Sequence, residues 1–221
     1  MPRSHSPAIA VFCFKQTARL LRAIGLRANR VRRSAPFIVV YKNPLSERTR
    51  EFKHAQALKV SPAAFYKMIN VFIFHGTGGH PEENWFPWLK QKLEKLGCKV
   101  IVPRFPTPEN QTLENWLKIL KNYEQFYNEN TILVGHSLGG AFLLRVLEKY
   151  NVKIKATFLI AAPIGILPIK NYKSDKLFLG NFTFDWEKIK NHCKKFFVFH
   201  SDNDPYVCLE NGEILSKKLN T

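Results

Sequence analysis

The sequence predicts an α/β protein, a three-layer αβα sandwich built on a mainly parallel sheet. Short apolar runs alternate along the chain with segments whose apolar residues recur at helical spacing. The apolar runs are uninterrupted, which is typical of strands buried on both faces. Three of these runs lead directly into glycine-rich or polar turns, as strands do at the carboxyl edge of a parallel sheet.

These elements follow one another in a regular order from residue 68 onward. Strands are predicted at residues 69–74, 99–102, 132–134, 157–161 and 196–200, and helices at 85–96, 113–127, 141–150 and 209–219. The first helix places five apolar residues on one face between Trp85 and Leu96. Gly97 follows, where a helix C-terminus favours glycine, and Pro103 closes the second strand.

Charge divides the chain near Met68. The net charge is +17, but residues 1–67 hold 14 of the 34 basic residues and only two acids, Glu47 and Glu51. The rest carries 20 Lys and Arg against 15 Asp and Glu, and Lys replaces Arg as the common base. We therefore predict a basic, weakly patterned extension over residues 1–67 and a folded domain over residues 68–221.

Three interpretations of the extension stay open. Its Arg-rich, acid-poor stretch QTARLLRAIGLRANRVRRS resembles an organelle-targeting peptide. A basic arm that binds nucleic acid or anionic lipid is the second interpretation. The third, which we favour, is a disordered or spurious extension, with Met68 as the natural first residue of the domain. Residues 37–41 are predicted to form one strand within it.

Composition limits the class and the compartment. Hydrophobic residues make up 45% of the chain and aromatic residues 13%, which is enough for a core. No run of 18 apolar residues occurs, so we expect no membrane span. The four cysteines lack CxxC spacing, which favours reduced thiols in a cytoplasmic protein; organelle import is the alternative. No set of residues has metal-ligand spacing, and the oligomeric state stays open.

The stretch TILVGHSLGG, at residues 131–140, fits a nucleophile elbow. A buried strand runs into Gly135-His136-Ser137-Leu138-Gly139, and an apolar helix follows at once. Such a turn holds the serine hydroxyl out of the sheet, and its glycines avoid clashes. The Leu138 N–H at the helix start can stabilise a developing oxyanion. A plain packing turn is the alternative interpretation.

Two further turns are expected at the same edge. His75-Gly76-Thr77 opens the HGTGG segment after the first strand, and the Thr77 N–H is the candidate for a second oxyanion donor. A phosphate-binding loop is disfavoured because no Gly-Lys-Ser/Thr follows. SDNDPYV comes after the last strand, where Asp204 is the candidate triad acid and Asp202 the alternative. Both aspartates also suit an ordinary turn.

Together with NWFPWL and FDWEKI, these motifs make residues 68–219 resemble the small α/β-hydrolase-fold serine hydrolases, in the group related to retinoblastoma-binding protein nine and YdeN. The resemblance implies a compact α/β-hydrolase fold and carboxylesterase-type hydrolysis of a small-molecule ester or acyl substrate, with no cofactor. It assigns the nucleophile to Ser137 and the acid to Asp204. Residues 1–67 lie outside the resemblance.

The histidines depart from this pattern. The triad histidine of the group follows the acid in chain order, whereas all seven histidines here precede Asp204. We therefore expect a chain truncated at the C-terminus, lacking its last strand and helix, with weak activity. His80 is a remote candidate for the base.

Two other function classes stay open. One is a catalytically inactive binding or scaffold protein, and the other is a nucleic-acid binder that uses the extension, although we expect no nucleic acid at the folded domain. Residues 164–186 fit either a cap over the site or ordinary core packing.

Overall fold

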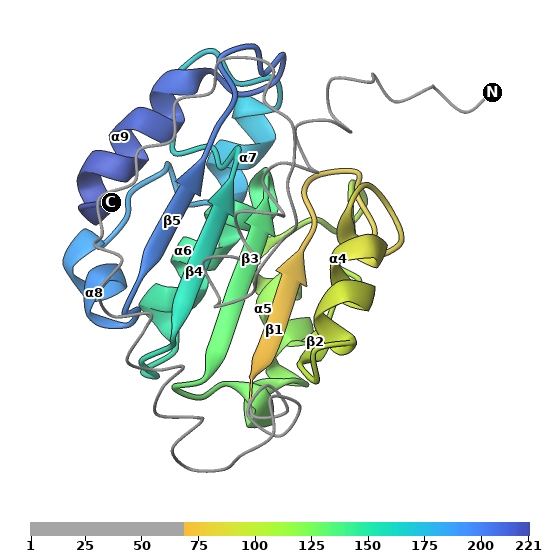
Figure 1. Ribbon diagram of the computed structural model, residues 1–221. Helices are drawn as coiled ribbons and strands as arrows, with labels where there is room; N and C mark the ends of the chain where they lie inside the picture. Colours follow the sequence, from red (N-terminus) through yellow and green to blue (C-terminus); the bar gives the residue numbers. More distant parts are fainter. Residues whose placement is uncertain (1–68) are drawn as a thin grey trace, which may run out of the picture.

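The computed structural model describes residues 69–221, which form an α/β domain around a five-stranded sheet (Figure 1). The strands are β1 (Asn70–Phe74), β2 (Lys99–Ile101), β3 (Thr131–His136), β4 (Ala156–Ile160) and β5 (Phe196–Phe199). The helices are α4 (Phe86–Glu94), α5 (Leu113–Lys121), the 3₁₀ turn η1 (Glu124–Phe126), α6 (Leu138–Lys149), α7 (Tyr172–Phe178), α8 (Trp186–Asn191) and α9 (Leu209–Leu219).

The strand order is β2-β1-β3-β4-β5, and every pairing between these strands is parallel. The register brings the strand ends level: Phe74 pairs with Gly135, and Ile160 pairs with both His136 and Phe199. The segments that follow β1, β3 and β5 therefore leave the sheet at the same edge, as the sequence predicted.

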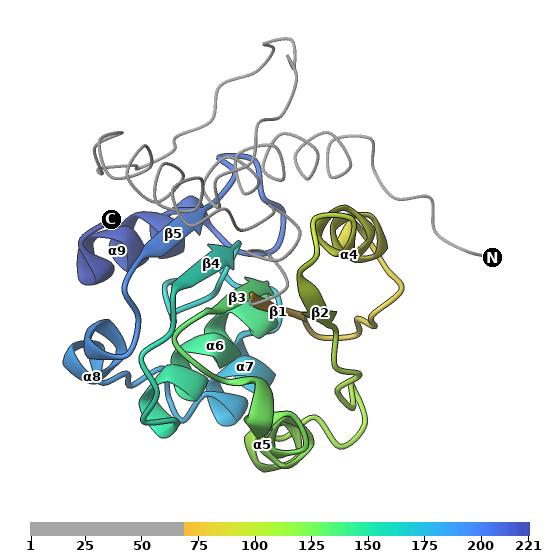
Figure 2. The same ribbon diagram turned by 60° about the horizontal axis from the view of Figure 1, so that its bottom comes forward.

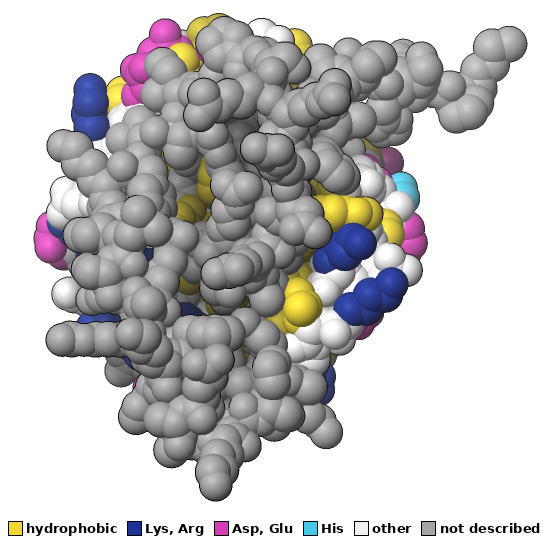
Figure 3. All heavy atoms as spheres, viewed as in Figure 1, with side chains coloured by type: hydrophobic (Ala, Val, Ile, Leu, Met, Phe, Trp, Pro, Cys, Tyr) yellow, Lys and Arg dark blue, Asp and Glu magenta, His cyan; other side chains and the backbone are white. Residues whose placement is uncertain are grey.

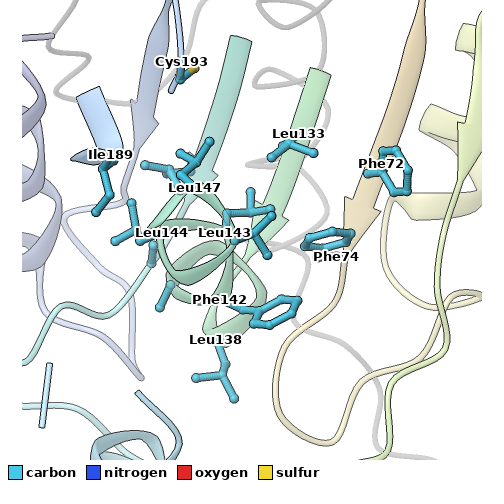
Figure 4. Close-up of a cluster of buried hydrophobic side chains, with 14 of the residues drawn as sticks. Phe72, Phe74, Leu133, Leu138, Phe142, Leu143, Leu144, Leu147, Ile189 and Cys193 are labelled. Carbon is cyan, nitrogen blue, oxygen red and sulfur yellow. The ribbon is translucent and has the colours of Figure 1, made fainter. Parts of the chain in front are cut away.

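One face of the sheet carries the larger apolar core. Side chains from alternate strand positions, including Phe72, Phe74 and Leu133, pack against α6. Figure 4 shows Phe142 and Leu143 of α6 lying toward these strand residues. The helices α5, α6, α7 and α8 lie on this side of the sheet, and α9 packs beside the edge strand β5 (Figure 2).

The opposite face carries a second core. Among the described helices, α4 packs here, and its buried residues Phe86, Leu89 and Leu93 meet the other set of strand side chains. On β4 and β5, Phe158 stacks on Phe197 with ring centroids 4.4 Å apart. Lys and Arg side chains lie beside apolar ones over α4 in the view of Figure 3. The structure is thus the predicted three-layer arrangement.

Element boundaries differ from the prediction in several places. The helix predicted from residue 141 begins at Leu138, directly after Ser137. The helix predicted over 113–127 ends at Lys121 and is followed by η1. Helices α7 and α8 were not predicted; within this 164–186 region Phe178 and Phe184 are buried in the main core.

Other predictions concern the rest of the chain. The extension over 1–67, its strand at 37–41, Cys13, His5 and His54 lie outside the described residues. Within residues 69–221, no helix is long and apolar enough to cross a bilayer. The three cysteines of this range are free thiols, and burial raises the pKa of both Cys98 and Cys193 to about 11.

Replacing Phe142 by Ala should lower the free energy of unfolding by about 3–5 kcal/mol, because the ring is fully buried and its loss leaves a cavity. Leu177→Ala is the matched control, since Leu177 is 85% exposed and its truncation should cost less than about 0.5 kcal/mol. Urea unfolding followed by circular dichroism measures both. Equal midpoints for the two variants would contradict the packing described.

Candidate active site

Ser137 occupies a strained turn between β3 and α6. Its backbone has φ 54° and ψ −128°, a conformation that a residue with a Cβ rarely adopts. The Ser137 N–H donates to the Ile160 carbonyl of β4 at 2.9 Å, and the Ser137 carbonyl accepts from Gly140 N–H at 2.9 Å. These bonds fix the turn on both sides, between the end of β3 and the start of α6.

The glycines on either side of Ser137 are required by close backbone packing. A Cβ on Gly135 would lie 2.6 Å from the Gly139 carbonyl oxygen. A Cβ on Gly139 would overlap the His75 carbonyl oxygen and lie 2.6 Å from that of Phe74. The first turn of α6 therefore lies directly against the end of β1, and no side chain fits between them.

The HGTGG segment lies beside the serine. A Cβ built on Gly76 would stand 2.8 Å from the Ser137 Cβ and 3.2 Å from its Oγ. The two segments that the sequence placed at one edge are thus in contact. Gly76 is the residue that leaves room for the Ser137 side chain.

Two amide groups at this junction lack an acceptor among the described residues. Within residues 69–221, neither Thr77 N–H nor Leu138 N–H donates to a protein acceptor. The neighbouring amides of the loop are used: Gly79 N–H donates to the Gly76 carbonyl and Gly78 N–H to the Thr107 hydroxyl. Leu138 N–H also opens α6, whose N-terminus favours negative charge.

His75 supports the HGTGG segment through hydrogen bonds of both ring nitrogens. Its Nε2 accepts from Phe105 N–H at 3.0 Å, so the ring proton lies on Nδ1, which is 2.9 Å from the Gly76 carbonyl. Burial lowers the pKa of this imidazole, and the hydrogen bond to Gly76 offsets this only in part. His75 is therefore a neutral structural group that joins the loop to the segment after β2.

His136 is the elbow residue directly before Ser137, at the end of β3. Its ring packs edge-on against Trp85 and Phe86, and its Nδ1 is buried with no partner among the described residues. Burial lowers the pKa of His136 to about 4; the negative charge of Asp204 acts against this, and His75 acts with it. The ring is thus neutral, and the field of the Asp204 carboxylate reaches the residue next to Ser137.

Asp204 is held by its own loop. Its Oδ1 accepts from Tyr206 N–H at 2.9 Å and Val207 N–H at 3.0 Å. Its Oδ2 lies 4.0 Å from His200 Nε2, which itself donates to the Val207 carbonyl at 2.8 Å. The Asp204 side chain is 15% exposed. The alternative acid, Asp202, is exposed.

The structure brings no described imidazole to the Ser137 hydroxyl. His75, His192 and His200 bond to backbone groups, and His136 is enclosed by aromatic rings. His80, the remote candidate for the base, is half exposed and lies 3.3 Å from Glu82. Also within residues 69–221, no group of three His, Cys, Asp or Glu side chains is placed to hold a metal ion.

Sequence analysis missed two polar residues at this edge, Thr107 and Gln111, which bond to the HGTGG segment. The signal available was their position after the second strand, since β2 ends at the same edge as β1. They belong to the segment between β2 and α5, where no recognised motif occurs.

The parallel sheet, the strand-to-helix serine turn and the adjacent glycine-rich loop define an α/β-hydrolase-fold protein. Residues 71–221 match the serine hydrolase family, and the chain belongs to that family. YdeN of Bacillus subtilis (strain 168) is 32% identical over 151 residues, which cover 67% of this chain and 78% of YdeN. Serine hydrolase RBBP9 of Rattus norvegicus is 27% identical over 146 residues, covering 66% and 76%. The resemblance inferred from the motifs is confirmed.

Solved structures agree on the fold. The crystal structure of the ydeN gene product from B. subtilis has a TM-score of 0.64 at 31% identity, over 69% of this chain and 82% of that one. Est1E from Butyrivibrio proteoclasticus has a TM-score of 0.50 at 19% identity, over 69% and 75%. The second likeness concerns the fold alone.

Gly76→Ala should slow phosphonylation of Ser137 by a fluorophosphonate about 10²-fold, because the new methyl group displaces the hydroxyl. Gly78→Ala is the control in the same loop: its Cβ meets nothing within 4 Å, and its cost is about 1–2 kcal/mol of stability for the left-handed backbone. Intact-mass spectrometry follows the adduct with time. Equal rates for the two variants would contradict the contact between Gly76 and Ser137.

Proposed function

We propose that the protein is a carboxylesterase-type serine hydrolase that acts on a small-molecule ester or acyl substrate. The Ser137 oxygen attacks the substrate carbonyl, and the negative charge that develops on the carbonyl oxygen is stabilised by Thr77 N–H and Leu138 N–H. The alcohol leaves, and water then releases the acyl group from Ser137. The observation that carries this proposal is that Ser137 contacts Gly76 of the HGTGG segment, and that the two amides beside this contact, Thr77 N–H and Leu138 N–H, donate to no acceptor among the described residues.

Asp204 is proposed as the acid that orients an imidazolium and stabilises its charge. Two backbone N–H groups hold its Oδ1, whereas its Oδ2 accepts from no backbone group among the described residues. Asp202 is the weaker candidate because it is exposed and no backbone group of the turn is shown to orient its carboxylate.

The general base is proposed to be an imidazole that Asp204 orients, as in the serine, acid, histidine triad of this fold, and none of the described imidazoles reaches the Ser137 hydroxyl. The 221-residue chain is then expected to turn over slowly through Ser137 and its amide donors, since oxyanion stabilisation and binding persist when a triad member is lost.

The second candidate is a binding protein that keeps the fold without the chemistry. It is favoured by one observation: none of the imidazoles in residues 69–221 reaches the Ser137 hydroxyl. The two candidates differ in the reactivity of Ser137, which only the enzyme requires.

Ser137→Ala should abolish both p-nitrophenyl acetate turnover above background and the mass adduct formed with a fluorophosphonate, because the attacking oxygen is lost. Ser174→Ala, an exposed hydroxyl on α7, should leave both unchanged. An unmodified wild-type protein after prolonged incubation would support the binding protein instead.

Free imidazole should raise the Ser137-dependent turnover of the 221-residue chain by roughly tenfold or more, as part of the 10²–10⁴ that a positioned base supplies. The Ser137→Ala protein measures the reaction of imidazole with ester in solution, which is subtracted. Asp204→Asn should remove most of the rescue, because the imidazolium loses its carboxylate. Asp202→Asn should keep it. Equal loss in both aspartate variants would contradict the assignment of Asp204.

A further inference from the structure

Two side-chain hydrogen bonds connect the HGTGG loop to the segment between β2 and α5, and a third joins the two side chains of that segment. Gly78 N–H donates to the Thr107 hydroxyl at 2.6 Å. The Thr107 hydroxyl donates to Gln111 Oε1, and Gln111 Nε2 donates to the Thr77 hydroxyl at 3.3 Å. Thr107 and Gln111 therefore bind both residues that follow Gly76, Thr77 and Gly78. We call Thr107 and Gln111 the loop clamp.

The loop clamp stands on a rigid base. Phe105 is buried and stacks on Trp116 with ring centroids 4.5 Å apart, while its N–H donates to His75. Trp116 Nε1 donates to the Pro106 carbonyl at 2.9 Å. Just beyond Gln111, the Thr112 hydroxyl caps α5 by accepting from Asn115 N–H. The segment that carries the clamp is thus tied to the core at both ends.

Gly78 is held by its hydrogen bond to Thr107 rather than by packing. Gly78 has a left-handed backbone, with φ 71°, and no atom lies within 4 Å of the position its Cβ would take. Within the loop, one backbone bond, from Gly79 N–H to the Gly76 carbonyl, closes the turn. Thr77 N–H belongs to the Gly76–Thr77 peptide, whose carbonyl is bonded by Gly79 N–H and His75 Nδ1. The clamp holds the other side of Thr77, through the Thr77 hydroxyl and the N–H of the following peptide.

We propose that Thr107 and Gln111 are positioning residues, which hold the Thr77 N–H toward the oxygen of the reacting carbonyl. This role rests on the proposed function, because it presumes that Ser137 is acylated beside Thr77. By taking up Gly78 N–H, Thr107 leaves Thr77 N–H as the free donor of the pair. Gln111 binds the Thr77 side chain, so that Thr77 is held both by its own hydroxyl and by the peptide that follows it.

The test uses the full 221-residue chain with four variants. Thr107→Val and Gln111→Ala remove the clamp, Thr107→Ser retains the hydroxyl, and Gln125→Ala changes an exposed glutamine on η1. Hydrogen–deuterium exchange of peptides covering residues 75–80 reports the loop, and the rate of Ser137 phosphonylation reports the oxyanion donors. Thermal unfolding shows whether each variant is folded.

Thr107→Val and Gln111→Ala should each speed exchange in the loop and slow phosphonylation by about tenfold, less than the 10²–10³ lost when a donor is removed outright. Thr107→Ser and Gln125→Ala should match the wild type in both measurements. In active preparations, the clamp variants should lower kcat more than they raise KM, because the interaction belongs to the transition state.

Each of the other possible results would overturn a stated part of the proposal. Unchanged loop exchange in both clamp variants overturns the clamp. Faster exchange with unchanged phosphonylation overturns the positioning role and leaves a purely structural contact. A wild-type Ser137 that is never phosphonylated overturns the proposed function and the positioning role with it, while the exchange data still report whether the clamp holds the loop.

Discussion

The arrangement of this site depends on one close approach, between the first turn of α6 and the end of β1. Gly139 lies so near the Phe74 and His75 carbonyl groups that no side chain fits there, and Gly135 lies equally near the backbone of the same turn. This contact places Ser137 in its strained conformation and brings Gly76 against the serine side chain. The strain is sustained because the hydrogen bonds of Ser137 to β4 and α6 over-determine the turn.

The two histidines near this contact, His75 and His136, are kept neutral, and the Asp204 and His200 side chains are hydrogen-bonded to the backbone. His75 and His136 are both disfavoured as cations by burial, so neither places a positive charge under the glycine loop. Asp204 Oδ1 accepts from Val207 N–H, and His200 Nε2 donates to the Val207 carbonyl. Both side chains thus bind the segment that follows them. These bonds stiffen the loop that carries Asp204, which in the proposed mechanism favours preorganised electrostatic stabilisation over reorganisation during reaction.

Much of the fold and part of the site could be predicted from the sequence. Uninterrupted apolar runs ending in HGTGG, GHSLG and SDND fix the strands and their shared edge, because parallel strands end level. The start of α6 was placed at residue 141 rather than Leu138, since Gly139 and Gly140 are poor helix formers. Packing against β1 overrides that preference. Thr107 and Gln111 could not be recognised, because their partners lie about 30 residues away and no local pattern marks such a contact.

The two sides of the site come from different parts of the chain, and this separation has a chemical consequence. The serine and both amide donors lie between His75 and Leu138, where the glycine loop, its clamp and the elbow support one another. The acid lies beyond β5, attached to α9 through its own loop. Under the proposed function, oxyanion stabilisation persists when proton transfer is impaired, because among the described residues no hydrogen bond of Thr77 or Leu138 involves the loop that carries Asp204. In the proposed mechanism, such a chain retains the part of catalysis that depends on fixed amide dipoles, and the rate of proton transfer varies independently with the imidazole that reaches Asp204.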